Sequence, residues 1–319
     1  MTVTATPKQI HYLPRASYSR ISVYKSCPRQ YKLKYKDLIP EPDRPIMLDR
    51  AGKPKASASE RGSWIHDSMD NYINNRSPFD ISMLNGEELL PSADKTPIPL
   101  LPELLNIKME VEELKRLKTE RPDTTFTEQK WYYDMDWDEI NSIHLDGPDK
   151  GKPIHLSKID YAIIAIIDCM VIDDYTDPDF ITARIIDLKS GKSYNNASKH
   201  AAQLNLYAAA AAHKFPEIKE FTLELLYCDE GKHVIRQVTR EQALIYGNYW
   251  EVQILSMHKD QYYDPQATAA NCRFCPYGAL STPHKINGNK WVNRSNDCDS
   301  FIEHPNDTKW RLEQEAKIP

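Results

Sequence analysis

The chain has 319 residues but contains little of what several classes of protein require. Its longest apolar run, residues 161–167, is far shorter than the roughly 20 residues of a membrane-spanning helix. The first twenty residues lack the apolar stretch of a secretory signal, so we expect a cytoplasmic protein. Glycine occurs only 10 times, and neither glycine-rich phosphate-binding motif, GxGxxG or GxxxxGKS/T, is present. These absences argue against a membrane protein and against a nucleotide-binding protein of the P-loop or Rossmann type.

Charge is distributed unevenly along the chain. The net charge is −5, from 41 basic and 46 acidic side chains, which by itself disfavours a nucleic-acid partner. Between residues 15 and 36, however, seven Lys and Arg residues occur without a single Asp or Glu, and four tyrosines are interleaved with them. Two interpretations stay open. Either the tyrosines stack on unpaired bases while the cations follow a nucleic-acid backbone, or the segment is a solvated helix whose tyrosines pack into the core.

Hydrophobic periodicity divides the chain into helical and extended segments. The spacing predicts a pair of helices in 17–35, interrupted at Pro28, with Ser19 as the N-cap. Further helices are predicted in 61–74, 101–118, 197–215 and 240–258. Alternating or β-branched runs indicate strands at 126–137, 154–165, 166–173, 182–188, 221–228 and 233–238, while 36–59 has the composition of a loop. We therefore expect an α/β protein with a sheet at its core.

Residues 166–192 carry the most informative pattern. They fit a β-hairpin in which Asp168 precedes one apolar strand segment and Asp187 and Lys189 end the next. Because residues two apart in a strand point to the same face, Asp187 and Lys189 project together, and Asp168 can lie across the hairpin from them. Two carboxylates with a nearby lysine suit a Mg²⁺ site for phosphodiester hydrolysis, since carboxylates hold the metal and the ammonium orients or deprotonates water. The same pattern also occurs as a plain surface ion pair at a strand end.

Two further groups of polar residues lie outside this hairpin. Lys199, Gln203 and Tyr207 are spaced four apart, so a helix places them in one polar stripe on an otherwise alanine-rich surface. This stripe is either a solvent face or the partner of a polar site. His66 falls on the apolar side of its helix near Trp64, where a histidine is more often a hydrogen-bonded core residue than a ligand.

Taken together, these motifs resemble the PD-(D/E)XK nuclease superfamily, in its branch similar to the RecB nuclease domain and the CRISPR-adaptation exonucleases. Residues 17–31 look like the family's opening helix with its Cys-Pro, 62–66 like its GxxxH, Asp168 with 187–189 like its catalytic core, and 203–207 like its QxxxY. The resemblance extends from residue 17 to residue 275. It implies a restriction-endonuclease-like α/β fold, in which a central mixed β-sheet is flanked by helices, with an N-terminal helical region and an irregular C-terminal cap.

The resemblance also implies roles for individual residues. It implies that Mg²⁺ or Mn²⁺ is bound by His66, Asp168, Asp187 and the carbonyl of Leu188. Lys189 would assist the attacking water. Gln203 and Tyr207 would steady the site and the DNA strand. Asp160 competes with Asp168 for the position of the first aspartate, and Asp168 is preferred because apolar strand residues directly follow it. The expected contacts to DNA are Arg20, Lys25, Arg29, Lys32, Lys34 and Lys199.

Six cysteines in a cytoplasmic chain suggest free thiols, catalytic groups or metal ligands before disulfides. Many members of this branch hold a 4Fe–4S cluster with one N-terminal and three C-terminal cysteines, for which the candidates here are Cys27, Cys272, Cys275 and Cys298. The third C-terminal cysteine is expected a few residues after Cys275, but it is missing, and residues 281–282 stand near that position. Cys298 could substitute for it across a long loop. Three outcomes stay open: an iron–sulfur cluster, a Zn²⁺ site with His284 as a donor, or no metal. Cys169 and Cys228 are expected to be core residues.

We expect a metal-dependent DNA nuclease, most specifically an exonuclease acting on DNA ends in recombination, repair or viral DNA processing. The alternative is a catalytically silent nuclease-fold protein that binds DNA or a partner protein. The nuclease domain is expected at 15–280, with a helical part at 15–120 and a catalytic core at 125–260, between a flexible lead at 1–14 and a polar tail or cap at 281–319. A nuclease without an attached helicase suits a phage or mobile element in a bacterial cytoplasm, with no membrane partner.

Overall fold

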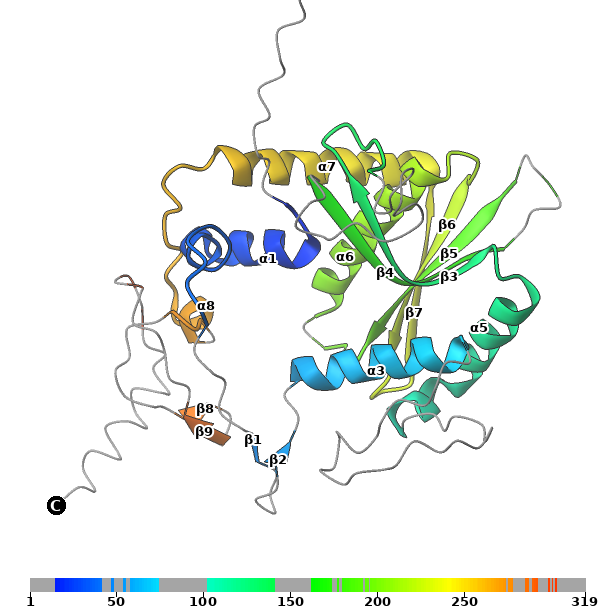
Figure 1. Cartoon of the computed structure of the whole chain (residues 1–319), viewed down its shortest axis with the longest axis horizontal. Coiled ribbons are helices and arrows are strands. Elements are labelled where there is room, and N and C mark those ends of the chain that lie inside the picture. Colours follow the sequence, from blue (N-terminus) through cyan, green and yellow to red (C-terminus); the bar gives the residue numbers. More distant parts are fainter. Residues whose placement is uncertain are drawn as a thin grey trace, which may run out of the picture.

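A five-stranded mixed β-sheet with helices on both faces forms the centre of the computed structural model, as the sequence predicts (Figure 1). The strands follow the order β3-β4-β5-β6-β7 across the sheet. The structure describes residues 15–41, 47–48, 54–55, 58–74, 102–140, 162–173, 177, 180–191, 193–194, 196–273, 275–277, 285–286, 289–291, 298, 300 and 302.

The sheet is antiparallel except at one pair of strands. Its strands are β3 (Thr125–Tyr133), β4 (Ile163–Ile172), β5 (Thr182–Lys189), β6 (Glu220–Tyr227) and β7 (Lys232–Thr239). Only β5 and β6 are parallel among these neighbours. A parallel pair needs a crossover connection, and helix α6 (Ala197–Lys214) supplies it. The carboxyl ends of β5 and β6 consequently lie side by side, with Lys189 opposite Tyr227.

The two faces of the sheet carry separate hydrophobic cores. On one face, α6 and α7 (Arg240–Lys259) pack through the larger core, where the five consecutive alanines 208–212 of α6 are fully buried. On the other face, α3 (Ala58–Ile73), the 3-10 turn η2 (Pro102–Ile107) and α5 (Lys108–Glu120) pack on a smaller core (Figure 1). These helices confirm the four predicted helical segments that follow residue 60, with ends that differ by a few residues. Among the described residues, no helix is both long and apolar enough to cross a membrane.

The N-terminal helical region has the predicted break but a different cap. Its elements are α1 (Tyr18–Ser26), α2 (Pro28–Tyr31) and the π-helical turn η1 (Lys32–Lys36). The remaining short elements are β1 (Met47–Leu48), β2 (Pro54–Lys55), α8 (Ala269–Arg273), β8 (Lys285–Ile286) and β9 (Asn289–Trp291). Pro28 occupies the first position of α2, where no backbone N–H is needed. The N-cap of α1 is Ser17, whose Oγ accepts the Arg20 N–H at 3.3 Å, so the prediction of Ser19 as the cap is wrong.

Strand β4 differs from the prediction in a way that bears on function. The sequence predicted two strands that meet between residues 165 and 166, whereas β4 is continuous and 154–161 lie outside the described residues. The alternation of side chains nevertheless reverses within it. Odd-numbered residues up to Ile167 belong to the larger core, but beyond Asp168 even-numbered residues such as Met170 do. Asp168 therefore marks an irregularity in an otherwise regular strand.

Candidate active site

The candidate site lies where β4 separates from β5. The two strands pair from Cys169 to Ile172 of β4, so Asp168 stands at the fork between them. The carboxylate of Asp168 accepts the backbone N–H of Leu188 in β5 at 2.7 Å, which fixes the side chain. Opposite Asp168 on β3, Glu128 has a φ of 47°, a left-handed conformation that costs energy for a residue with a side chain. Irregular strand geometry of this kind re-aims side chains and is common beside active sites.

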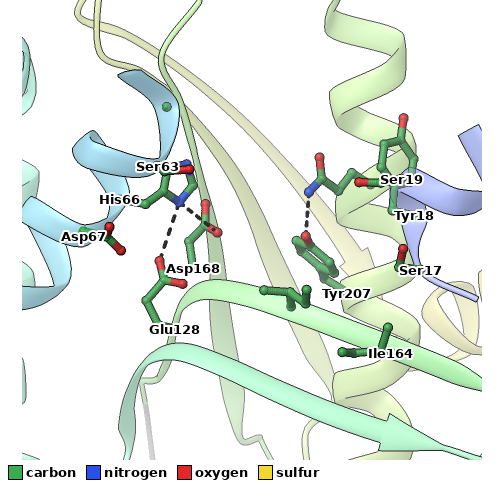
Figure 2. A pocket seen from close by; sticks show the side chains of 13 residues that line it. Ser17, Tyr18, Ser19, Ser63, His66, Asp67, Glu128, Ile164, Asp168 and Tyr207 are labelled. Atoms are coloured by element: carbon green, nitrogen blue, oxygen red, sulfur yellow. Dashed lines mark hydrogen bonds and ion pairs between the residues drawn. The ribbon is translucent and has the colours of Figure 1, made fainter. Parts of the chain in front are cut away.

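Three side chains from three elements converge beside this fork. His66 of α3, Glu128 of β3 and Asp168 of β4 each offer a ligand atom within 4.8 Å of the other two, and we call them the acid–histidine group (Figure 2). Nδ1 of His66 lies 3.3 Å from Oδ1 of Asp168 and 3.5 Å from Oε1 of Glu128. Carboxylate oxygens with an imidazole nitrogen form a donor set suited to a divalent cation.

A second set of polar side chains adjoins Asp168. Asp187 is fully buried, and Nζ of Lys189 lies 2.6 Å from its Oδ2. The same ammonium donates to Oε1 of Gln203 at 2.9 Å, and the Gln203 amide donates to the hydroxyl of Tyr207 at 2.5 Å. Strand alternation places Lys189 beside Asp187, and one turn of helix places Tyr207 beside Gln203. Two neighbours from different elements therefore hold Lys189 in one orientation.

The pKa values of the site reflect both burial and neighbouring negative charge. Burial alone would lower the pKa of His66, but the charges and hydrogen bonds of Asp168 and Glu128 outweigh it and raise that pKa to about 10. Burial raises the pKa of Asp187 to about 7, an effect that Lys189 opposes and Asp168 strengthens. Groups that hold protons so firmly sit where additional positive charge is favourable. A divalent cation supplies such charge.

The surroundings of the buried carboxylate oxygens show whether these residues suit a metal ion. Both oxygens of Asp187 and Oε1 of Glu128 are buried without a hydrogen-bond partner among the described residues. The close approach of Lys189 to Asp187 is thus an ion pair without good hydrogen-bond geometry. Buried acceptors left without hydrogen bonds are costly, and oxygen-rich donor sets match the preference of Mg²⁺ and Mn²⁺. The residues present therefore fit a divalent cation.

The structure groups these residues differently from the sequence prediction at one position. His66 and Asp168 come together as expected, but Glu128, which sequence reasoning missed, completes their group of three. Asp187 instead faces Lys189. The signal that could have identified Glu128 is the register of β3 against β4, because the flanking cross-strand pairs place it opposite Asp168. The competing candidate Asp160 lies outside the described residues.

The acid–histidine group opens into a cavity of about 340 Å³. Its lining includes Tyr18, His66 and Tyr207, which are labelled in Figure 2, together with Gly62, Ile166 and Gln203. The hydroxyl of Tyr18 donates to the carbonyl of Lys199 at 2.6 Å, so α1 is tied to α6 beside the cavity. Ile166 is 37% exposed and adds an apolar surface close to the charged groups. The cavity can therefore receive a ligand that has both charged and apolar parts.

The tyrosines of the basic segment 15–36 pack against the protein and are not free to stack on bases. All four are buried or packed against the larger core, which favours the second interpretation of this segment. Lys32 pairs with Asp37 at 2.6 Å, and Lys34 pairs with Glu41 at 2.5 Å. Two of the cations expected to contact DNA are therefore neutralised locally.

Four of the six cysteines line a second cavity, which we call the cysteine cavity. They are Cys27, Cys272, Cys275 and Cys298, and the rest of the wall combines apolar residues with the amide side chains of Gln30 and Asn271. Burial raises the pKa of Cys275 to about 11, and the three other cysteines add to this shift. Among the described residues, the cysteines do not form a group of three close enough to hold a single metal ion. Because all four cysteines line one cavity, Cys298 lies near the other three despite the long intervening sequence.

The other cysteine expectations concern the core and zinc. Cys169 and Cys228 are fully buried in the smaller core, which confirms that prediction. All six cysteines are free thiols. His284, the alternative donor for zinc, lies outside the described residues.

Two of three comparisons with known proteins give matches. The family model described as PD-(D/E)XK nuclease superfamily matches residues 15–280, well over half of the chain. The solved structure described as "Crystal structure of SSO0001" is similar at 13% sequence identity, with 85% of each chain covered and a TM-score of 0.32. No curated protein matches the chain. The extent of the family match establishes that the chain belongs to the PD-(D/E)XK nuclease superfamily.

Proposed function

We propose that this protein is a metal-dependent DNA exonuclease that hydrolyses phosphodiester bonds at DNA ends, within the RecB-like or CRISPR-adaptation-exonuclease-like branch of its superfamily. One observation carries the proposal: the acid–histidine group stands beside the ion pair of Asp187 and Lys189 at the fork in the sheet. Nucleases of this superfamily use divalent metals, and the donor set fits such an ion. We place the activity in recombination, repair or phage DNA processing.

Each residue of the site has a part in the proposed hydrolysis. The residues that would hold Mg²⁺ or Mn²⁺ are His66, Glu128 and Asp168, with Asp187 and the carbonyl of Leu188 as further donors. A divalent ion held there supplies Lewis-acid stabilisation of the phosphoryl oxygens. Lys189, fixed by Asp187 and Gln203, orients the attacking water and offsets negative charge at phosphorus. Tyr207 holds the amide of Gln203 in place.

The size of the cavity supports action at strand ends. A volume of about 340 Å³ lies in the lower part of the range for small-ligand pockets, so the cavity suits a nucleotide-sized part of one strand. The proposed contacts to the remaining strand are Arg20, Lys25, Arg29, Lys32, Lys34 and Lys199. Lys199 is exposed and lies one turn before Gln203 on α6. We expect Lys32 and Lys34 to contribute least, because acidic neighbours already pair with them.

Cleavage of end-labelled linear, nicked and closed-circular DNA in Mg²⁺, Mn²⁺ or EDTA tests this function. We expect metal-dependent shortening of linear DNA from an end, while closed circles survive. Asp187→Asn and Lys189→Met should each lower the rate about 10³-fold, because they alter the metal and water environment and leave the hydrophobic core intact. Lys214→Met is the matched control, since Lys214 also pairs with a carboxylate, that of Glu139, but stands at the C-terminal end of α6, away from Gln203.

The outcomes of this experiment separate the two candidate functions. Undiminished turnover in both site variants would refute the assignment of the active site. Cleavage of closed circles would replace the exonuclease with an endonuclease. DNA binding by the wild type without cleavage of any substrate would favour the catalytically silent alternative, and the search would turn to a partner protein.

We also propose that the cysteine cavity binds a 4Fe–4S cluster through Cys27, Cys272, Cys275 and Cys298. Four thiols in one cavity supply the donors that such a cluster needs. Tetrahedral Zn²⁺ with Zn–S bonds of about 2.3 Å would hold its sulfurs about 3.8 Å apart. The described cysteines do not form a group close enough to hold a single ion, and a cluster of four irons spreads its ligands more widely than one ion does. The wider spacing therefore supports a cluster over zinc.

A further inference from the structure

An arginine joins the helix that carries His66 to the strand that carries Lys189. Arg61 belongs to α3, five residues before His66, and its side chain is 27% exposed. Its Nη1 donates to the carbonyl of Ser190 at 2.6 Å, and Ser190 directly follows Lys189 at the end of β5. Arg61 is not among the described residues that line the active-site cavity. It therefore contacts the backbone next to the proposed catalytic lysine from outside the substrate site.

The same guanidinium also binds the strand next to β5. Nη1 and Nη2 pair with the two carboxylate oxygens of Asp229, the first at 3.1 Å, in the turn that follows β6. Nε donates to Oε1 of Glu103 in η2 at 3.3 Å. The planar guanidinium of arginine presents its donors as a rigid fork and can hold such a set of acceptors in one geometry. One side chain of α3 thus binds the residues just beyond the carboxyl ends of two adjacent strands.

Two further contacts hold the backbone at this junction. The N–H of Cys228 donates to the carbonyl of Lys189 at 2.9 Å, so the hydrogen bonding between β5 and β6 continues to the last residue of β5. Gly62, the neighbour of Arg61, lies so near that an added Cβ would meet Oγ of Ser190 at 3.3 Å. The carbonyls of Lys189 and Ser190 are therefore both fixed, the first by β6 and the second by α3.

The other contacts of Lys189 do not fix it relative to α3. Its ammonium is held by Asp187 of its own strand and by Gln203 of α6. The smaller core packs α3 on the sheet, but hydrophobic contacts have no preferred direction. The hydrogen bond from Arg61 to the Ser190 carbonyl adds a directional link between α3 and the end of β5. That link joins the element of a proposed metal ligand to the element of the lysine that orients water.

We propose that Arg61 is a positioning residue that holds the end of β5 against α3, so that the ammonium of Lys189 stays in place beside the acid–histidine group. This inference rests on the proposed nuclease function and adds to it a residue that does not touch the substrate. Without Arg61 the end of β5 shifts, while the hydrophobic cores and the surface that binds DNA persist. A displacement of a catalytic group by about 1 Å lowers the rate about 10²-fold.

Steady-state cleavage of end-labelled linear DNA by the full chain in Mg²⁺ tests the inference, at a temperature where every variant is folded. We expect Arg61→Ala to lower kcat about 10²-fold and to change KM by less than about twofold. Arg184→Ala is the matched control. Arg184 is 26% exposed and pairs with Asp173 at 3.2 Å, but it lies toward the opposite end of β5 from Lys189. Its loss should leave kcat within about twofold of the wild type.

A double variant tests whether Arg61 acts through Lys189. Adding Arg61→Ala to Lys189→Met should lower kcat by no more than about twofold, because the group that Arg61 positions is already absent. A purely structural role would instead lower kcat by the same factor in both backgrounds. This measurement therefore separates positioning of Lys189 from a general loss of stability.

The results that overturn the inference differ from those that overturn the proposed function. A wild-type kcat in Arg61→Ala, an equal loss in Arg184→Ala, or a full further loss in the Lys189→Met background would each eliminate the positioning role. A raised KM with unchanged kcat would assign Arg61 to DNA binding and overturn it as well. In all these cases the wild type cleaves DNA and the nuclease stays in place. A wild type that cleaves no DNA would refute the proposed function and the inference together.

Discussion

Helix α1 connects two groups of ligand residues with different chemistry. Its first residue, Tyr18, lines the active-site cavity, and its C-cap, Cys27, lines the cysteine cavity. The first site offers carboxylates and an imidazole, which suit Mg²⁺ or Mn²⁺, whereas the second offers thiols, which suit iron–sulfur clusters or zinc. One helix of nine residues therefore links a centre suited to hydrolytic chemistry with a centre suited to structural ligation.

The two centres also differ in what holds them together. The acid–histidine group stands on adjacent strands and a helix that pack against extensive hydrophobic cores on both faces of the sheet. The cysteine cavity joins Cys27 to distant C-terminal residues and is supported by a small cluster that includes Leu33 and Tyr277. A small cluster buries little apolar surface, so ligation has to supply more of the stability there. Losing a ligand should therefore change chemistry at the first centre and stability at the second.

Of the changes that test this difference between the two centres, we expect the largest effect from a substitution in the cysteine cavity. Cys275→Ser should abolish iron incorporation and lower the free energy of unfolding by about 3 kcal/mol or more, because metal binding to the folded state is lost. Iron and sulfide content, the visible absorbance of anaerobically purified protein and urea unfolding measure these effects. Mn²⁺ binding at the acid–histidine group should be unchanged in the fraction that stays folded.

Cys228→Ser provides the control for this experiment. Cys228 is also fully buried, but it belongs to the smaller core and not to the cysteine cavity. This variant should keep its iron. Iron retained by Cys275→Ser, or zinc found in place of iron in the wild type, would contradict the proposed cluster.

The acid–histidine group shows which parts of a site a sequence can reveal. The relation of Asp168, Asp187 and Lys189 follows from strand alternation and one hairpin, and the structure brings them together. Glu128 could not be found in this way, because its place depends on the register of β3 against β4 and on a left-handed backbone. Local periodicity contains neither piece of information.

The fold shows the same limit at longer range. The sheet and its flanking helices follow from periodicities that each segment carries by itself, so the fold class was predictable. The N-cap of α1 was misassigned because Ser17 and Ser19 are both suitable capping residues, and only the observed hydrogen bond distinguishes them. The approach of Cys298 to Cys27 depends on tertiary packing across most of the chain.

A smaller effect is expected at the acid–histidine group when metal binds. The pKa of His66 is about 10 in the presence of Asp168 and Glu128, so the imidazole is protonated at pH 7.5. A nitrogen that carries a proton cannot ligate, so Mn²⁺ binding should release about one proton and strengthen as pH rises from 6 to 9. Titration calorimetry in buffers of different ionisation enthalpy measures the proton count.

Two histidine variants sharpen this measurement. His66→Asn should reduce the proton release to the fraction that Asp187, with a pKa of about 7, still holds, and should weaken Mn²⁺ binding roughly tenfold or more, while its iron content stays that of the wild type. His213→Asn is the control, because His213 stacks on Trp137 outside the active-site cavity. Proton release that stays at the wild-type level in His66→Asn would show that another group gives up the proton.

The smallest effect concerns His200, which neighbours the proposed catalytic lysine. Its Nδ1 lies 2.9 Å from the hydroxyl of Tyr227, and burial, followed by the charges of Lys189 and Lys199, lowers its pKa to about 4. The unfolded chain keeps a histidine pKa of about 6.5, so it takes up the proton first as the pH falls. His200 therefore costs no stability above pH 6.5 and destabilises the protein progressively between pH 6.5 and pH 4.

Urea unfolding of the wild type and His200→Gln at pH 7.5 and pH 5.0 isolates this contribution. Relative to the variant, the wild type should lose about 1 kcal/mol between these pH values, a figure reduced for the solvent screening of a half-buried ring. If the wild type instead became more stable than His200→Gln as the pH falls, the folded protein would bind the His200 proton more tightly than the unfolded chain does.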